Sequence, residues 1–165
     1  MSAREPSSSL PVRVREAQPH DHAVIVAFNA RLAAETEGKP LDPEILARGV
    51  AQALAEPDRL RYWVAEVQDE AGQTTVVGQA AVTREWSDWR NGWVWWFQSV
   101  YVRPDHRRRG IFRALYQEIR SAARAAGDVI GLRLYVENDN TIAQRTYAAL
   151  GLKPGRYHIL EEFFG

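Results

Sequence analysis

A dense group of basic side chains lies in the stretch Val100–Leu115, which reads VYVRPDHRRRGIFRAL. Three consecutive arginines, Arg107–Arg109, stand directly before Gly110, and an amphipathic segment follows. If that segment is a helix, the N–H groups of its first turn have no partner within the helix, and its macrodipole adds partial positive charge to that of the arginines. Glycine also allows a ligand to come close to the backbone. These residues therefore predict a phosphate-binding turn.

A second group of residues has the types needed to hold a positively charged amine. Trp86 and Trp89 stand beside Glu85 and Asp88. Aromatic faces attract cations and carboxylates pair with them, so this stretch is a candidate acceptor site. The tryptophans that come after Trp89 are explained by a buried strand.

The composition excludes several classes of protein. The 165 residues carry 21 basic and 21 acidic side chains, so no excess of positive charge favours general nucleic-acid binding. Cysteine is absent, which excludes disulfides, thiolate metal sites and a cysteine nucleophile. The four histidines are scattered and predict no metal site. No apolar run approaches the roughly 20 residues that span a bilayer, and the N-terminus lacks an apolar signal segment, so we expect a cytoplasmic protein without a membrane partner.

The hydrophobic pattern predicts a single domain over residues 11–165, after a loose, serine-rich tail over residues 1–10. Apolar residues three and four apart predict helices, and alternating ones predict strands. Helices are expected to begin near Pro19, at Pro43, after Gly110 and after Asn140. Strands are expected over Val12–Val14, Arg61–Val67, Thr74–Thr83, Trp93–Val102, Ile130–Val136 and Tyr157–Phe164. A strand, a helix and a parallel strand in this order cross over right-handed, which places the helix after Gly110 against the sheet.

The longest expected strand, Trp93–Val102, has apolar residues at most of its positions. Strict alternation places Phe97 and Tyr101 on one face and Val100 and Val102 on the other. Both faces should therefore be covered by other parts of the chain.

Two stretches resemble the signature motifs of the GNAT superfamily of acyl-CoA-dependent N-acetyltransferases. They are VYVRPDHRRRGIFRALY, which starts at Val100, and LYVENDNTIAQRTYAALGL, which starts at Leu134. The order of elements before them also matches, so the resemblance extends over nearly the whole chain. It implies an α/β (α+β) fold with a central mixed, mostly antiparallel sheet of about six to seven strands flanked by about four helices. It also implies transfer of an acetyl group from acetyl-CoA to a primary amine, by direct attack in a ternary complex.

The resemblance assigns roles to matching positions. The backbone of Val100 and Val102 would pair with the pantetheine arm of acetyl-CoA. Arg107 would be the first residue of the family's cofactor-binding turn, and the backbone N–H groups near Arg108, Arg109, Gly110, Phe112 and Arg113 would receive the pyrophosphate. Glu35 and Glu37 lie where relatives close over the acceptor amine, although a solvated helix end explains both equally well. Asn140 would contact the pantetheine arm, and Tyr147 would protonate the leaving sulfur as general acid. Phe112 departs from the family pattern, which has glycine or alanine at that place.

Other interpretations stand beside this one. Tyr147 could be a core tyrosine, and Asn140 is a good helix N-cap whether or not it meets a ligand. The chain could be a catalytically silent sensor or scaffold that binds acyl-CoA, or it could bind nucleic acid through its arginines. No Gly-Lys-Ser/Thr follows the turn, which excludes a P-loop. The acceptor would be a small-molecule or peptide amine, the base would be water, Glu85 or Asp88, no metal is implied, and the chain would be a monomer or a homodimer.

Overall fold

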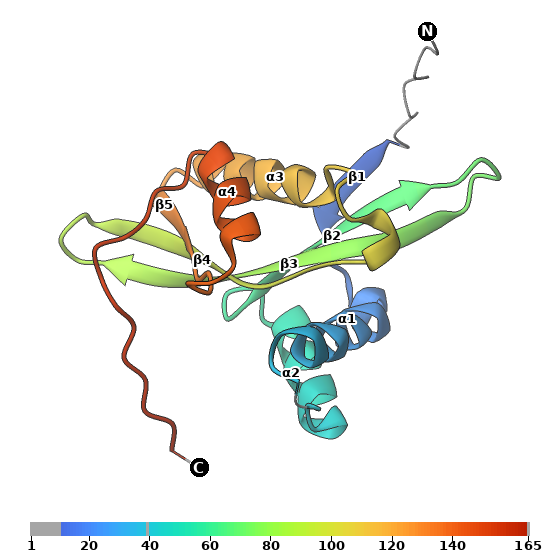
Figure 1. Ribbon diagram of the computed structural model, residues 1–165, viewed down its shortest axis with the longest axis horizontal. Helices are drawn as coiled ribbons and strands as arrows, with labels where there is room; N and C mark the ends of the chain where they lie inside the picture. The colour runs from blue at the N-terminus through green and yellow to red at the C-terminus, as the bar shows by residue number, and fades with distance from the viewer. Residues whose placement is uncertain (1–10, 39, 165) are drawn as a thin grey trace, which may run out of the picture. The chain divides into compact units, whose positions relative to one another are not determined.

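Figure 1 shows the computed structural model of the protein, which describes residues 11–38 and 40–164. The chain divides into two compact units, Met1–Leu134 and Tyr135–Gly165. The expected loose tail, residues 1–10, lies outside the described residues. Within the described ranges, no helix has the length and apolar character needed to cross a membrane.

The first unit is built on a five-stranded sheet with the order β1-β2-β3-β4-β5. Its strands are β1 (Val12–Glu16), β2 (Arg61–Gln68), β3 (Thr74–Ser87), β4 (Gly92–Val102) and β5 (Val129–Leu134). Strands β1 to β4 pair antiparallel, and β5 joins β4 in parallel. The expected mixed, mostly antiparallel sheet is therefore confirmed.

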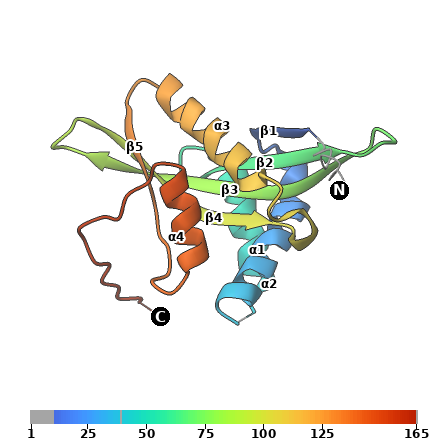
Figure 2. The same ribbon diagram turned by 45° about the horizontal axis from the view of Figure 1, so that its top comes forward.

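Helices cover both faces of this sheet, as Figure 2 shows. They are α1 (His22–Thr36), which follows the short 3-10 helix η1 (Pro19–Asp21), α2 (Pro43–Ala55) and α3 (Ile111–Ala125). On one face, Ile25 of α1 and Val50 of α2 share a buried cluster with Ala81 of β3. On the other face, Tyr116 of α3 stacks on Phe97 of β4, with ring centroids 5.8 Å apart. The helix after Gly110 thus packs against the sheet as expected.

A bulge in β4 overturns the expected alternation of its side chains. Ala80 of β3 pairs with Val100, whereas Val82 pairs with Phe97, so β4 has one residue more than β3 over this interval. An extra residue reverses the facing of every side chain beyond it. Phe97 consequently packs on α3, while Tyr101 lies 5.0 Å from an aromatic ring of α1 on the opposite face. The prediction that Phe97 and Tyr101 share a face was wrong, because a bulge is a property of the strand pair.

The described residues form five strands, fewer than the six to seven expected, and the predicted strand Tyr157–Phe164 is absent. Tyr157 and Leu160 are 89% and 94% exposed. An alternating pattern stabilises a strand only where a neighbouring strand supplies hydrogen bonds, and the described part of the second unit contains no strand. By contrast, β3 runs past its predicted end to Ser87, because β4 pairs with it as far as Gly92.

The second unit contains one helix in its described part, α4 (Thr141–Ala149). Asn140 caps this helix, since its Oδ1 accepts a hydrogen bond from the backbone N–H of Ala143 at 3.0 Å. Gly151 follows the end of the helix with φ = 93°, a left-handed conformation that suits glycine. The expected short helix and its cap are both confirmed.

Candidate functional site

The phosphate-binding turn expected from the sequence joins β4 to α3. A 3-10 helix, η2 (Pro104–His106), follows β4, and α3 begins directly after Gly110. Gly110 has φ = 81° and Arg108 has φ = 61°, so both lie in the left-handed region. Glycine adopts this conformation easily, whereas an arginine there holds local strain of the kind that clusters at functional sites. The turn leads into a helix N-terminus whose first N–H groups are available to an anion.

Gly78 of β3, which belongs to neither sequence motif, allows α3 to start close to the sheet. A Cβ atom added to Gly78 of β3 would lie 3.0 Å from Ile111 Cγ2 and 3.1 Å from the carbonyl oxygen of Tyr101. Ile111 is the first residue of α3 and is buried. Gly78 therefore positions the N-terminus of α3, and the signal that points to it is a glycine inside a strand pattern.

Several basic side chains near the turn already have acidic partners. Arg103 Nη2 lies 2.8 Å from Asp105 Oδ2, and His106 Nδ1 lies 3.0 Å from Asp105 Oδ1. The close approach of His106, and then of Arg103, holds the pKa of Asp105 at about 2. Arg107 Nη2 lies 2.6 Å from Glu35 Oε2. Much of the positive charge of Arg103 and Arg107 is thus balanced within the protein.

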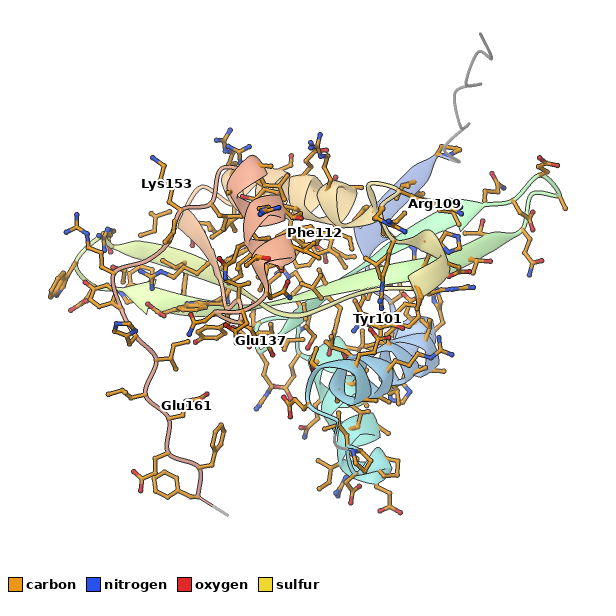
Figure 3. The ribbon with its side chains drawn as sticks, in the orientation of Figure 1. Tyr101, Arg109, Phe112, Glu137, Lys153 and Glu161 are labelled. Atoms are coloured by element: carbon orange, nitrogen blue, oxygen red, sulfur yellow. The ribbon has the colours of Figure 1, made fainter. Side chains whose placement is uncertain are left out.

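Three other arginines, Arg108, Arg109 and Arg113, are exposed and have no ion pair or side-chain hydrogen bond with any residue of the described ranges. They surround the N-terminus of α3 in the sequence, and Figure 3 shows Arg109 at the turn before that helix. An uncompensated cluster of guanidinium groups beside unpaired backbone N–H groups is suited to a multiply charged anion. These residues form the candidate anion site.

The end of β4 beside this turn has an open edge. Strand β5 pairs with β4 only as far as Phe97, which lies opposite Leu134. On the other side of β4, the N–H of Arg103 donates to the carbonyl oxygen of Val77 at 2.9 Å. Because the polar groups of an antiparallel strand alternate in direction, those of Val100 and Val102 face away from β3. Within the described part of the first unit, this edge can receive an extended ligand.

Glu85, a candidate for the acceptor site, lies on the face of the sheet that α1 and α2 cover. Its Oε2 accepts from Trp96 Nε1 and its Oε1 accepts from Arg133 Nη1, each at 2.8 Å. The Arg133 guanidinium also lies 5.4 Å from the Trp96 ring centroid. Glu85 remains about half exposed, at 48% of its side chain. Its carboxylate is thus oriented by two donors and is still open to solvent.

Trp86 and Asp88 are not brought together with Glu85. Trp86 is the next residue of β3 and faces the opposite side of the sheet, where it packs edge-on against Trp93 at 4.9 Å. Asp88 lies in the turn between β3 and β4, and its Oδ1 accepts the backbone N–H of Trp89 at 2.9 Å. Glu85, Trp86 and Asp88 are neighbours in the sequence, but their side chains do not converge on one position in the structure.

Asn140 and Tyr147 belong to the second unit. The Asn140 side-chain oxygen is engaged as the N-cap of α4. Tyr147 lies in α4, and burial raises the pKa of its phenol above the ordinary value. A phenol with a raised pKa is protonated at neutral pH, as a proton donor must be.

Phe112, the residue that departs from the family pattern, lies in the first turn of α3 (Figure 3). Its ring lies 6.2 Å from that of Tyr116, which in turn stacks on Phe97. Its ring thus extends the aromatic packing between α3 and the sheet. Among residues 11–38 and 40–164, no group of three or more histidine, aspartate or glutamate side chains is gathered as a metal site.

Comparison with known proteins supports the resemblance seen in the sequence. Residues 25–152 match the model of the acetyltransferase (GNAT) family. The chain is similar to a solved structure from Clostridium difficile 630, described as a possible acetyltransferase. The two share 40% identity with a TM-score of 0.83, over 93% of this chain and 97% of that one. No curated protein matches the chain significantly.

Two more distant structures show the same fold. One is the aminoglycoside antibiotic 6'-N-acetyltransferase AAC(6')-Ih from Acinetobacter baumannii, with 15% identity and a TM-score of 0.71 over 94% of this chain and 100% of that one. The other is a predicted acetyltransferase with acetyl-CoA from Clostridium acetobutylicum, with 18% identity and a TM-score of 0.72 over 92% and 96% of the two chains.

Proposed function

Because the chain belongs to the GNAT family of acetyltransferases, we propose that it transfers an acetyl group from acetyl-CoA to a primary amine by direct attack in a ternary complex. The observation that carries this proposal is the turn between β4 and α3. There, three arginines without acidic partners in the described chain stand at a helix N-terminus, beside the open edge of β4.

These features fit two chemical parts of acetyl-CoA, its pyrophosphate and its pantetheine arm. The pyrophosphate of acetyl-CoA is doubly charged, and Arg108, Arg109 and Arg113 supply charge-assisted hydrogen bonds next to free N–H groups. The pantetheine arm contains amide groups, which can pair with the outward-facing backbone of Val100 and with the N–H of Val102, whose carbonyl oxygen already accepts from Arg107. A relative of similar fold is described with acetyl-CoA, which agrees with this proposal.

In the proposed reaction, the neutral amine nitrogen attacks the thioester carbonyl carbon, and a carbon–nitrogen bond forms. The carbon–sulfur bond breaks when the tetrahedral intermediate collapses, and Tyr147 gives its proton to the leaving sulfur. The proton lost by the nitrogen passes to water or to Glu85.

A small-molecule amine is the acceptor that we favour over a peptide. A family member of the same fold is an aminoglycoside 6'-N-acetyltransferase, so this architecture can serve small amines. In the first unit, the half-exposed Glu85 offers one local negative group to an ammonium ion. A panel of small amines and peptides, assayed by release of the coenzyme A thiol, identifies the acceptor, and the protein adds no background thiol because it lacks cysteine.

The catalytic assignment is tested with Tyr147→Phe. Loss of the proton donor should lower kcat by about a hundredfold or more while acetyl-CoA still binds. Tyr157→Phe is a matched control, since Tyr157 is 89% exposed and should behave as wild type. Equal turnover by Tyr147→Phe and wild type from pH 6 to 9 would show that Tyr147 is not the acid.

The donor assignment is tested separately by thermal unfolding. Acetyl-CoA at about 100 times its Kd should stabilise the protein by about 2.7 kcal/mol, which corresponds to a rise in Tm of roughly 5–10 °C. No rise at millimolar acetyl-CoA would contradict the donor assignment. A rise without turnover of any amine in the panel would instead indicate a silent acyl-CoA sensor or scaffold.

A further inference from the structure

Arg107 differs from the arginines that follow it, because its side chain is anchored in the first unit of the protein. Its Nη2 lies 2.6 Å from Glu35 Oε2 at the end of α1, and its Nε donates to the carbonyl oxygen of Val102 at 2.9 Å. Its guanidinium carbon lies 5.6 Å from the centroid of the Tyr101 ring. One side chain thus connects α1, the end of β4 and the turn.

Glu35 is held from two sides in the same cluster. Its Oε2 receives Arg107, and its Oε1 accepts from the Tyr101 hydroxyl at 3.3 Å. Tyr101 is buried and packs on Phe28 of α1. The Glu35 carboxylate, which accepts from Arg107, is therefore held in place by a well-packed side chain. Both carboxylate oxygens of Glu35 are engaged by side chains of the first unit.

The contacts of Arg107 affect the candidate anion site, which begins at the next residue. Arg108 adopts a strained left-handed conformation, and such a conformation persists only where the surrounding structure holds it. Arg107 stands directly before Arg108 and is the residue of the turn whose side chain reaches both a helix and a strand. The Glu35–Arg107 ion pair is 42% and 44% exposed, so its direct contribution to stability is small. The main effect of the ion pair should be on the conformation of residues 107–110.

We propose that Glu35 and Arg107 are positioning residues that together hold residues 107–110 in the conformation that receives the pyrophosphate. This inference rests on the proposed function and refines it. Glu35 then sets the affinity for acetyl-CoA and does not contact the acceptor amine, and the phosphate contacts come from Arg108, Arg109 and Arg113.

Steady-state kinetics of Glu35→Gln distinguish a positioning role of Glu35 from binding of the acceptor amine and from simple neutralisation of Arg107. Each role predicts a different change in the two KM values. The proposal predicts that KM for acetyl-CoA rises about fivefold, through loss of one charge-assisted contact, while KM for the amine stays constant. A rise in KM for the amine alone would make Glu35 an acceptor ligand and overturn the proposal. A fall in KM for acetyl-CoA would also overturn it, because it would mean that Glu35 only neutralises an arginine that binds phosphate.

Two further variants complete the kinetic test. Glu37→Gln removes a neighbouring exposed carboxylate that has no side-chain hydrogen bond with the described residues, and it should match wild type. Arg107→Gln should raise KM for acetyl-CoA. The double variant Glu35→Gln/Arg107→Gln should raise it no further, because each single change already breaks the same ion pair. Additive losses in the double variant would contradict the proposal.

A measurement without any ligand keeps this inference distinct from the proposed function. In the free protein, hydrogen exchange of the peptide covering residues 103–110 should be faster in Glu35→Gln than in wild type and Glu37→Gln. Unchanged exchange would overturn the positioning role. If wild type failed to bind acetyl-CoA, the proposed function would fail, and the exchange experiment would still decide whether Glu35 and Arg107 order the turn.

Discussion

At the scale of single residues, the anion site depends on backbone conformation as much as on charge. The run of arginines is visible in the sequence, but it does not show which of them are available. Arg107 is paired with Glu35, whereas Arg108 and Arg109 have no acidic partner in the described chain. The distinction depends on a contact between residues 72 positions apart, which no local pattern contains. Gly110, by contrast, could be predicted, because a left-handed residue before a helix favours glycine.

Gly110→Ala tests the importance of that backbone. An added Cβ would meet no atom within 4 Å, so the cost should come only from placing alanine at φ = 81°. We expect the free energy of unfolding to fall by about 1–2 kcal/mol and acetyl-CoA to bind more weakly. Urea unfolding and titration calorimetry measure the two effects.

Gly49→Ala is the matched control for this change. Gly49 lies inside α2, also has open space around it and has no positive φ. Alanine there should raise stability by about 0.5–1 kcal/mol and leave acetyl-CoA binding unchanged. If the two substitutions had the same effect, the left-handed backbone of Gly110 would not be the cause.

At the scale of elements, the helices were more predictable than the strands. Helices α2 and α4 carry their own caps, as Asp42 shows by accepting the N–H groups of Glu44 and Ile45. Helix α3 has no side-chain cap, but its apolar residues form one stripe. A strand depends on its partner. The bulge between Phe97 and Val100 exists only in the pairing of β4 with β3, and Tyr157–Phe164 has a strand pattern without a strand. Sequence periodicity therefore predicted the order of the elements but not the facing of Tyr101.

The contact between β3 and α3 gives a prediction at this scale. In Gly78→Ala, the new methyl group would press on Ile111 and on the backbone oxygen of Tyr101, which cannot move aside easily. Stability should fall by about 1–3 kcal/mol, and acetyl-CoA affinity should fall because the first turn of α3 shifts. Chemical unfolding and calorimetry again give both values.

Gly131→Ala provides the comparison, because a Cβ atom at this position of β5 would meet nothing within 4 Å. Its stability should stay within about 0.5 kcal/mol of wild type. Normal acetyl-CoA binding by Gly78→Ala would show that α3 does not need this close approach to the sheet.

At the scale of the whole molecule, the two sequence motifs fall in different compact units. The arginine turn belongs to Met1–Leu134, and Asn140 and Tyr147 belong to Tyr135–Gly165. The first unit also contains a buried ionic cluster that the sequence did not reveal. Arg15 of β1 contacts Asp21 of η1 at 2.7 Å and Glu66 of β2 at 2.6 Å. Glu66 is 51 residues from Arg15 in the sequence, so only the folded chain brings it to the other two.

This cluster predicts how stability depends on pH. Burial alone would raise the pKa of Asp21, but hydrogen bonds from Arg15 and from the backbone N–H of Gln18 outweigh it, so the pKa is lowered from 3.8. The unfolded chain therefore binds a proton at Asp21 more readily than the folded one. The stabilisation is fully present above about pH 4 and is lost as the pH falls through the lowered pKa.

Asp21→Asn should remove both the stabilisation and its pH dependence. At pH 7 the free energy of unfolding should fall by about 3 kcal/mol, because Asp21 is only 2% exposed and its loss leaves Arg15 with one carboxylate partner. Below pH 4, wild type should lose stability more steeply than the variant, since only wild type has this carboxylate to protonate. Asp58→Asn removes a carboxylate that is 81% exposed and paired with Arg84, and it should cost less than about 1 kcal/mol with an unchanged pH slope. Parallel pH profiles for Asp21→Asn and wild type would mean that another carboxylate controls acid unfolding, and Glu66, the second partner of Arg15, would be the next to substitute.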